Sequence, residues 1–410
     1  MSKKMKDSGT EWIGAIPEEW AVGNIGQLYN ERKEKVSDVD YQPLSVTMKG
    51  ILPQLSTAAK TDAHDDRKLV RKGDFAINSR SDRRGSCGIS SYDGSVSLIN
   101  TILMPRGKMH PAYYNWLFHS TMFSDEFYKW GHGIVDDLWT TGWQDMKKIT
   151  VPMPPLDEQE KIADFLDSEC SCIDSIIEQT RASIEEYKKL KQSIIMRAVT
   201  KGLRNNRPIR DSKVEWIGKI PSCWDVKKLK FIADFVQTKY SSEDGSLNYI
   251  GMENIVGWNG QYIATTSEYD REQSLICEQK DILFGKLRPY LAKVYISQER
   301  QCCSGEFAVI RIKQDYSVKF FWYQLISHGF IFMVDRSTYG TKMPRANVEY
   351  IKNIGMSIPS REEQKEITEY LDAKCIEIDR LITTKQQLLY ELENYKKSII
   401  YEYVTGKKEV

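Results

Sequence analysis

Hydrophobic residues recur every three or four positions along two long segments of the chain, residues 157–201 and 361–405. Neither segment contains glycine or proline, prolines stand just before each one, and Gly202 and Gly406 follow. This punctuation predicts two helices of about 45 residues, each about 65 Å long. The apolar positions keep a seven-residue period, which predicts that the helices pair as a coiled coil. The residues expected in its core are Leu166, Ile173, Ile177, Ile184, Tyr187 and Ile194 in the first helix and Leu371, Ile378, Ile382, Leu389, Leu392 and Ile399 in the second.

Charge along these helices indicates their relative direction. Residues 157–178 hold eight acids and one base, whereas residues 179–201 hold six bases and two acids. The second helix begins in the same way, with seven acids and two bases over residues 362–379. A parallel pair would set acid against acid, whereas an antiparallel pair sets each acidic half beside the more basic half of its partner. We therefore predict an antiparallel pair.

The chain is internally duplicated. The tripeptide Trp-Ile-Gly at residues 12–14 returns at 216–218, an offset of 204 residues, and Gln159 returns as Gln364, an offset of 205. The second offset holds without a gap for over forty residues, whereas similarity between these matched stretches is faint. Two variable blocks thus alternate with two constant ones, and we expect the halves to be related by an approximate two-fold axis.

The variable blocks combine short β-like runs with turns, and each also contains a candidate buried helix, at residues 112–120 and 320–328. Each is expected to be a compact domain of about 150 residues. The predicted fold is therefore α+β, with two globular domains joined by two long antiparallel coiled-coil helices. The expected boundaries are 1–156 for the first domain, 157–205 for the central helix, 206–360 for the second domain and 361–410 for the C-terminal helix.

Composition and charge limit the classes of protein to which the chain can belong. The net charge is +1, but residues 157–201 sum to −3 and residues 362–405 to −4, which leaves +8 for the remainder. Basic variable blocks suit a nucleic acid partner. No run of about 20 apolar residues exists, so we expect no membrane-spanning helix. The eight cysteines include no Cys-x-x-Cys pair, which favours reduced thiols in a cytoplasmic protein over a zinc site or a disulfide framework. Familiar phosphate-binding, metalloprotease and hydrolase motifs are absent, which argues against a catalytic role without eliminating one.

Turns of both variable blocks collect side chains that suit DNA. Arginine and lysine pair with phosphates or guanine edges, asparagine pairs with adenine, and Gly-Thr turns offer backbone amides to phosphates. The candidate DNA-binding residues are Asn78, Ser79, Arg80, Arg83, Arg84, Thr140 and Thr141 in the first block and Lys286, Arg288, Tyr290, Lys293, Gly340, Thr341, Lys342, Arg345 and Asn347 in the second. A basic loop alone is a weak signal, and the similar placement in both halves strengthens it.

The whole chain resembles the specificity (S) subunit of type I restriction–modification enzymes. The resemblance rests on a domain-start signature, Trp-Ile-Gly-x-Ile-Pro-x-x-Trp at 12–20 and 216–224, and on a helix-start signature at 154–162 and 359–367. The run from Lys280 to Leu291 is also similar to one common in that family, whereas the first half has Ser-Arg-Ser-Asp where the second has Lys-Leu-Arg-Pro.

The resemblance implies that each variable block is a target recognition domain that reads one half of a split, asymmetric site in double-stranded DNA. The helices would set the spacer between the half-sites and dock two methyltransferase subunits, and restriction subunits would join that core. S-adenosylmethionine, ATP and Mg would belong to these partners, and this chain would hold no cofactor, metal or catalytic residue of its own. It would not contact a membrane.

Two alternatives remain at this point. The first is a non-enzymatic coiled-coil adaptor with two protein-binding heads and no DNA role. The second is a self-sufficient nuclease or methyltransferase, which would show turnover by the purified chain alone.

Overall fold

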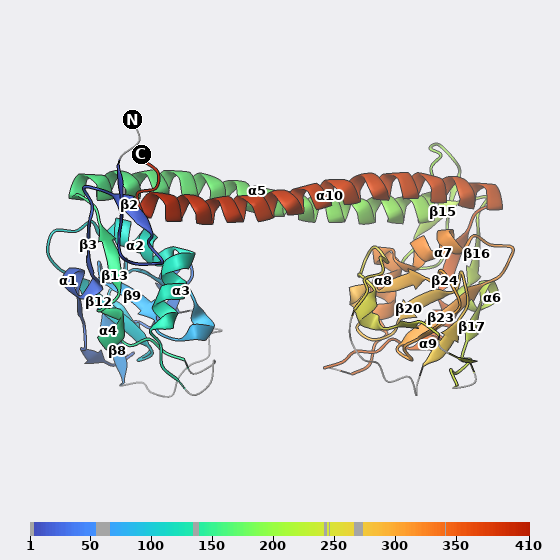
Figure 1. Cartoon of the computed structure of the whole chain (residues 1–410). Helices are drawn as coiled ribbons and strands as arrows, with labels where there is room; N and C mark the ends of the chain where they lie inside the picture. The colour runs from blue at the N-terminus through green and yellow to red at the C-terminus, as the bar shows by residue number, and fades with distance from the viewer. Residues whose placement is uncertain are drawn as a thin grey trace. The chain divides into compact units, whose positions relative to one another are not determined.

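The computed structural model describes residues 4–54, 66–133, 139–241, 244–245, 247–265, 274–340 and 342–410. The fold is α+β, as predicted, and the chain divides into two compact units. The terminal unit comprises residues 1–181 together with 387–410, and the central unit comprises residues 182–386. In each unit a globular head lies beside a pair of helices (Figure 1). Both long helices therefore contribute to both units, which differs from the expected division into heads and helices.

The two long helices are α5 (Leu156–Lys201) and α10 (Arg361–Val404). Gly202 directly follows α5, and Gly406 lies two residues beyond α10. Their φ values of 70° and 69° are the left-handed conformation that glycine adopts without steric cost. Gly406 also lies in close contact with the first head, because a Cβ there would stand 2.5 Å from Cδ of Pro17. The sequence punctuation therefore marks real helix ends.

The helices run antiparallel within each unit, as the charge pattern predicted. In the terminal unit Lys396 Nζ donates to both carboxylate oxygens of Asp174, at 2.6 and 2.7 Å. In the central unit Lys191 Nζ makes the same contacts with Asp379, at 2.8 and 2.7 Å. Lysine and aspartate of each pair are related to those of the other by the 205-residue offset, so the duplication repeats this ion pair.

The predicted coiled-coil core lies between the helices. Seven of its residues are buried, namely Leu166, Ile173, Ile177, Ile184, Leu371, Ile378 and Ile399. The other five, Tyr187, Ile194, Ile382, Leu389 and Leu392, are half-buried. Because Lys191 and Lys396 also occupy core positions of the heptad, each of these ion pairs lies at a seam whose other residues are largely apolar.

Many short elements build the first head. They are β1 (Met5–Asp7), β2 (Ala15–Pro17), β3 (Ala21–Asn24), α1 (Ile25–Leu28), β4 (Tyr29–Glu31), β5 (Lys35–Val36), β6 (Leu44–Thr47), β7 (Gly50–Pro53), β8 (Arg67–Val70), β9 (Phe75–Asn78), η1 (Ser81–Arg83), β10 (Cys87–Ile89), β11 (Gly94–Val96), β12 (Asn100–Pro105), α2 (Pro111–His119), α3 (Thr121–Lys129), α4 (Trp143–Met146) and β13 (Thr150–Met153).

The second head has a similar series. Its elements are β14 (Ile209–Asp211), β15 (Lys219–Pro221), β16 (Asp225–Lys228), α6 (Leu229–Ile232), β17 (Ala233–Val236), β18 (Tyr249–Ile250), η4 (Met252–Asn254), β19 (Leu275–Cys277), β20 (Ile282–Gly285), η5 (Pro289–Leu291), β21 (Val294–Ile296), β22 (Gln301–Cys303), β23 (Phe307–Ile312), α7 (Val318–Leu325), α8 (His328–Arg336), α9 (Val348–Asn353) and β24 (Gly355–Ile358).

Each head is built on a four-stranded antiparallel sheet with the same strand order. The order is β10-β9-β12-β4 in the first head and β21-β20-β23-β17 in the second. Asn78 pairs with Asn100 at the end of β9, and Gly285 pairs with Phe307 at the end of β20. These pairs give an offset of 207 residues between the two sheets, the same offset that relates Ser-Arg-Ser-Asp at 79–82 to Lys-Leu-Arg-Pro at 286–289.

One predicted element differs from the structure. The apolar stretch at residues 320–328 is not one helix, because α7 ends at Leu325 and α8 begins at His328. Ser327 separates them and caps α8, its hydroxyl oxygen accepting from the backbone N–H of Phe330 at 3.5 Å. Ser120 caps α3 in the same way in the first head, where the predicted helix 112–120 is α2.

The repeated Trp and Glu residues connect each head to a long helix. The indole N–H of Trp20 donates to the carboxylate of Glu158 at 2.8 Å, and Trp224 donates to Glu363 at 2.9 Å. All four residues belong to the duplicated signatures, and both tryptophans are fully buried. These signatures are therefore architectural, since they hold a head at the start of the helix that follows it.

The repeated glutamine completes this connection. The side chain of Gln159 accepts from the backbone N–H of His110 at 2.8 Å and donates to the carbonyl oxygen of Pro154 at 2.8 Å. Gln364 makes the corresponding two bonds in the second head. Each glutamine is buried, so its polar atoms must be paired, and the pairing fixes the start of the long helix.

Each head also shares its hydrophobic core with the end of the other long helix. The core of the first head includes Ile399 and Val404 near the end of α10. The core of the second head includes Ile195 and Val199 near the end of α5. Each unit is therefore one cooperative structure made from a head, the start of one long helix and the end of the other.

Candidate nucleic-acid interface

The structure brings the predicted DNA-binding loops of each head together. In the first head, the loop that follows β9 pairs with a second predicted loop through a backbone bridge between Arg80 and Thr140. In the second head, the loop that follows β20 makes the equivalent bridge between Leu287 and Arg345, and Arg345 also pairs with Tyr339. Two segments that are about 60 residues apart in the chain therefore form one surface in each head.

Arginines dominate this surface in the first head. Arg83 and Arg84 are largely exposed, and Arg84 contacts Asp125 at 3.1 Å while its guanidinium lies over the ring of Tyr128. Arg80 is held by Asp82, with 3.2 Å between Nε and the carboxylate. These ion pairs are exposed, so they are weak and can be exchanged for contacts with phosphate.

Three predicted residues of the first head support the loops. Ser79 is buried and its hydroxyl lies 3.0 Å from that of Thr101, while Thr141 is buried and its hydroxyl donates to the carbonyl of Phe127 at 2.8 Å. The Asn78 side chain accepts from the backbone N–H of Arg80 at 3.1 Å. The side chains of Ser79 and Thr141 therefore cannot reach DNA directly, although Thr140 between the loops is exposed.

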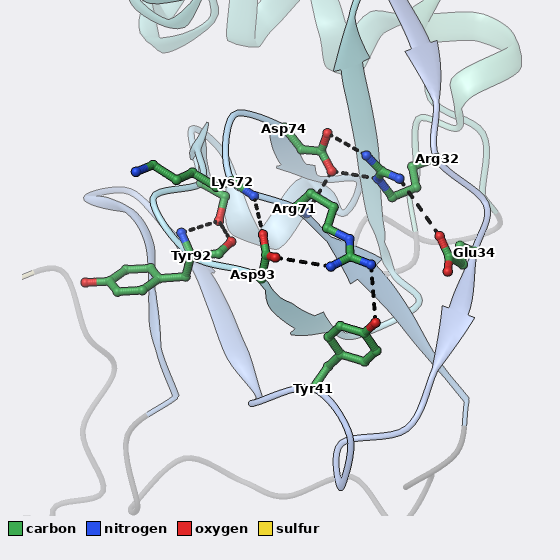
Figure 2. Close-up of polar contacts among 9 residues, drawn as sticks. Arg32, Glu34, Tyr41, Arg71, Lys72, Asp74, Tyr92 and Asp93 are labelled. Carbon is green, nitrogen blue, oxygen red and sulfur yellow. Dashed lines mark hydrogen bonds and ion pairs between the residues drawn. The ribbon is translucent and has the colours of Figure 1, made fainter.

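A buried aspartate fixes the start of the strand that leads to this loop (Figure 2). Asp74 accepts two hydrogen bonds from the guanidinium of Arg32, at 2.7 and 3.1 Å, and one from the backbone N–H of Arg71, at 2.8 Å. Asp281 occupies the same position before β20 and pairs with Arg311 at 2.8 Å. The two heads thus anchor the strand in the same way, with an arginine that directly follows β4 in the first head and one from β23 in the second.

The corresponding surface of the second head contains a polar groove of about 480 Å³. Its lining includes Lys286, Glu306 and Arg345 together with the aromatic side chains of Tyr249 and Tyr339. Burial lowers the pKa of the Lys286 ammonium, and the nearby Glu306 acts in the opposite direction. A polar groove that combines cations with aromatic faces is suited to nucleic acid.

Other predicted residues of the second head surround this groove or lie near it. Arg288 is exposed and has a left-handed backbone conformation, with φ of 49°, directly before η5. Its backbone N–H donates to the carbonyl of Pro344 at 2.8 Å. Tyr290 and Lys342 are also exposed. Lys293, in contrast, is half-buried and donates to the carbonyl of Met252 at 2.6 Å.

The remaining predicted residues shape the backbone of the second head. Asn347 caps α9, because its side-chain oxygen accepts from the backbone N–H groups of Glu349 and Tyr350. Gly340 has a φ of 90°, which a residue with a side chain rarely adopts. Thr341 lies outside the described residues.

Sequence reasoning missed Glu306, Tyr339 and Tyr249, which line the groove. The predicted DNA-binding residues were basic, amide and hydroxyl side chains together with Gly340 and Tyr290, and they did not include this acid or these two tyrosines. The register of β23 on β20 places Glu306 directly beside the predicted loop. Only that pairing, which the sequence did not reveal, could have found it.

The described residues contain neither a candidate metal site nor a membrane-spanning helix. In that part of the chain no three acidic, histidine or cysteine side chains gather as a metal site requires. No helix within the described ranges is both long and apolar enough to cross a bilayer.

Comparison with known proteins identifies the family. The model of the type I restriction modification DNA specificity domain matches the chain twice, at residues 17–186 and 221–394. The chain is 26% identical to the type I restriction enzyme MjaVIII specificity subunit of Methanocaldococcus jannaschii, covering 96% of this chain and 94% of that protein. It is 23% identical to the putative MjaX specificity subunit of the same organism, covering 97% and 96%.

Solved structures share the fold. A chain from a study of complex assembly and conformational transition of a type I R-M system superposes with a TM-score of 0.72 at 12% identity, covering 96% of this chain and 99% of that one. The HsdS subunit from Thermoanaerobacter tengcongensis gives a TM-score of 0.52 at 15% identity, covering 96% and 98%. These findings support DNA recognition and give no support to an adaptor without a DNA role. The chain belongs to the family of type I restriction–modification DNA specificity subunits and has two copies of its domain.

Proposed function

We propose that the two heads read the two halves of one bipartite, asymmetric site in double-stranded DNA. The observation that supports this most directly is the repeated loop pairing with different side chains. The first head presents Arg80, Arg83 and Arg84, whereas the second presents Lys286, Arg288 and Arg345 on equivalent loops. The same frame with different chemistry is what two unlike half-sites require.

Affinity and specificity have separate sources in this proposal. Exposed arginines and lysines bind phosphates of any sequence, which gives most of the affinity and makes it depend on salt. Side chains of the loops that enter a groove of the DNA contact base edges and give sequence preference. Holding both heads on one chain makes the second contact intramolecular, so two weak half-sites give one tight complex.

Selection from random DNA tests this proposal. The full-length chain, alone and together with a type I methyltransferase subunit, should enrich two short motifs separated by a constant number of unspecified base pairs. Replacing residues 206–358 with the block of a relative should change one motif and leave the other intact. Failure to enrich any bipartite motif under both conditions would favour the adaptor with protein-binding heads.

The paired helices are the proposed docking surface for two methyltransferase subunits. Ile176 and Tyr395 are 40% and 53% exposed, and both precede a seam residue of the terminal unit by one position. The ion pair between Asp174 and Lys396 sets a register that places them opposite each other on one flank.

The equivalent flank of the central unit bears Leu190 and Leu381, which are 47% and 40% exposed. The 205-residue offset relates Ile176 to Leu381 and Leu190 to Tyr395. Exposed apolar patches mark interaction sites, and two equivalent patches suit two copies of one partner. This duplication supports a stoichiometry of two methyltransferase subunits.

Native mass spectrometry of co-purified complexes tests the docking surface. Leu381→Glu should reduce the number of bound methyltransferase subunits from two to one, because a carboxylate cannot be buried unpaired in an apolar contact. Ile376→Glu is the matched control, since Ile376 is 54% exposed on the same helix and lies away from this flank. Two bound subunits in the Leu381→Glu complex would contradict the assignment.

We further propose that restriction subunits join this assembly and that S-adenosylmethionine, ATP and Mg are bound by the partners. The highly purified chain alone should then show no methyltransferase or nuclease turnover. The helices are also proposed to set the spacer. Inserting one heptad into each long helix, at matched levels of the pair, should lengthen the spacer or abolish activity, whereas an active complex with an unchanged spacer would refute this role.

A further inference from the structure

A carboxylate occupies the groove that the second head is proposed to offer to DNA. Glu306 is the one acidic side chain among the described residues that line the groove, and its side chain is 31% exposed. A carboxylate repels the phosphate backbone, so its presence there needs a specific reason. Its position among Lys286, Tyr339 and Arg345 suggests that the reason is a base edge.

Glu306 is held firmly beside two predicted DNA-binding residues. Its carboxylate accepts a hydrogen bond from Nη2 of Arg345, and its backbone carbonyl accepts from the backbone N–H of Lys286 at 2.8 Å. The carbonyl of Lys286 in turn accepts from the backbone N–H of Ala346 at 2.9 Å. Three chain segments therefore meet here, and the guanidinium and the carboxylate are mounted side by side.

The guanidinium of Arg345 and the carboxylate of Glu306 together match some base pairs better than others. An arginine offers several donors in a fixed fork, whereas a carboxylate only accepts. In the major groove guanine presents the acceptors N7 and O6, and its partner cytosine presents the N4 amino donor next to them. Adenine also offers an amino donor, but its N7 acceptor lies beside that group and would face the second carboxylate oxygen. Thymine and guanine offer only acceptors there.

We propose that Arg345 and Glu306 together read one G·C base pair in the half-site of the second head. Arg345 donates to N7 and O6 of guanine, and Glu306 accepts from N4 of cytosine. The donors and the acceptor of the protein then match the two acceptors and the donor of that base pair. This inference rests on the proposed function and assigns it a base pair and a specificity-determining residue.

The first head lacks this pair. The sheet registers place Ile99 where Glu306 stands, because Asn100 pairs with Asn78 as Phe307 pairs with Gly285. The loop bridges place Thr140 where Arg345 stands. The proposed G·C readout therefore belongs to one half-site, which is consistent with an asymmetric target.

Random-sequence selection with Glu306→Gln tests the proposal, using the full-length chain with a type I methyltransferase subunit. The wild-type chain should show a required G·C pair in the half-site of the second head. Glu306→Gln should reduce the preference for that pair by about tenfold or more, since a good base contact contributes that much discrimination. Preferences at all other positions should remain. Glu299→Gln, which changes an exposed carboxyl of the same head outside the groove, is the matched control.

A modified base isolates the carboxylate contact. N4-methylcytosine places a methyl group where the major-groove amino hydrogen lies, so it should weaken binding by the wild-type chain far more than binding by Glu306→Gln. Arg345→Lys keeps the charge, loses the fork and should reduce the preference for the same base pair.

The outcomes separate this inference from the proposed function. If the wild-type chain enriches no bipartite motif, the proposed function fails and this inference fails with it. If the wild-type chain enriches a bipartite motif and Glu306→Gln leaves every base preference unchanged, the inference alone is overturned, even where overall affinity falls. Loss of an A·T preference in place of a G·C preference would overturn it as well.

Discussion

Replacing Asp379 with alanine removes the partner of a lysine inside the helix pair. Lys191 occupies a core position of the heptad, its side chain is 10% exposed, and its ammonium contacts both oxygens of the Asp379 carboxylate. Without Asp379 this ammonium is left in a largely apolar seam. The duplication supplies an internal comparison, because Lys396 and Asp174 form the equivalent pair in the terminal unit.

The burial of each ion pair determines how much stability is expected to be lost when its aspartate is removed. A hydrogen bond to a charged group contributes about 1.5–3 kcal/mol, which is less than the roughly 3–5 kcal/mol lost when one partner of a fully buried ion pair is removed. The first figure applies to Asp379→Ala, because Asp379 itself is 34% exposed and water can reach the site. Asp174 is 57% exposed and Lys396 is 25% exposed, so Asp174→Ala should cost at most about 1 kcal/mol.

Lys191→Met gives the decisive contrast. It places an apolar side chain at a seam position and leaves the partly exposed Asp379 to be hydrated, so stability should stay within about 1 kcal/mol of the wild type. The double variant Lys191→Met, Asp379→Ala should recover most of the loss seen for Asp379→Ala alone.

Urea unfolding followed by circular dichroism measures these changes, and hydrogen–deuterium exchange of residues 182–201 and 361–386 assigns them to the central unit. Lys396→Met and Asp174→Ala are the matched controls. Equal destabilisation by Asp379→Ala and Asp174→Ala would refute the reasoning from burial. A Lys191→Met variant as unstable as Asp379→Ala would show that the ion pair itself, and not the unpaired charge, determines stability.

Three further predictions concern the helix end, pH and DNA. Gly406→Ala should lower the free energy of unfolding by at least about 1–2 kcal/mol, because alanine is strained in the left-handed backbone conformation of this position. Urea titration measures the change, and an unchanged free energy of unfolding would contradict the need for glycine there. Burial acts to raise the pKa of Glu363, but hydrogen bonds, led by that from Arg207, outweigh it and lower the pKa. The Glu363 carboxylate should therefore stabilise the fold above the ordinary carboxyl pKa, and this stabilisation should be lost as pH falls through the lowered pKa of Glu363. Glu363→Gln should flatten the acid side of a plot of melting temperature against pH. An unchanged plot would exclude this contribution. Lys286→Ala with Arg288→Ala should weaken DNA binding and reduce the salt slope by about one per lost phosphate contact in a titration at several salt concentrations; unchanged binding would remove both residues from the interface.

The long helices were predictable because their signals are local. Heptad spacing, the absence of glycine and proline, and the closing glycines all lie within one segment, and the structure places α5 and α10 there. The opposed charge halves were enough to indicate the antiparallel direction. The break at Ser327 was missed because apolar residues stand on both sides of it, and only the capping hydrogen bond distinguishes a helix boundary from a continuing helix.

The candidate site was predictable only in part, since it depends on pairing between distant segments. The basic loops were found from composition, but burial of Ser79 and Thr141 follows from contacts with Thr101 and Phe127 that sequence spacing does not show. Glu306 was missed for the same reason, because strand register brings it to the loop. Residue type indicates what a side chain can bind, and only the tertiary pairing shows which side chains share a surface.

The two halves of this duplicated chain differ in when they can be completed during synthesis. The central unit is contiguous, whereas the terminal unit needs Ile399, Ile400 and Val404 to finish a core that begins at Trp12. The first half to leave the ribosome must therefore wait until residues 399–404 have been translated. A premature stop codon shortly before residue 399 would then damage the amino-terminal reader first and leave the carboxy-terminal one nearly whole.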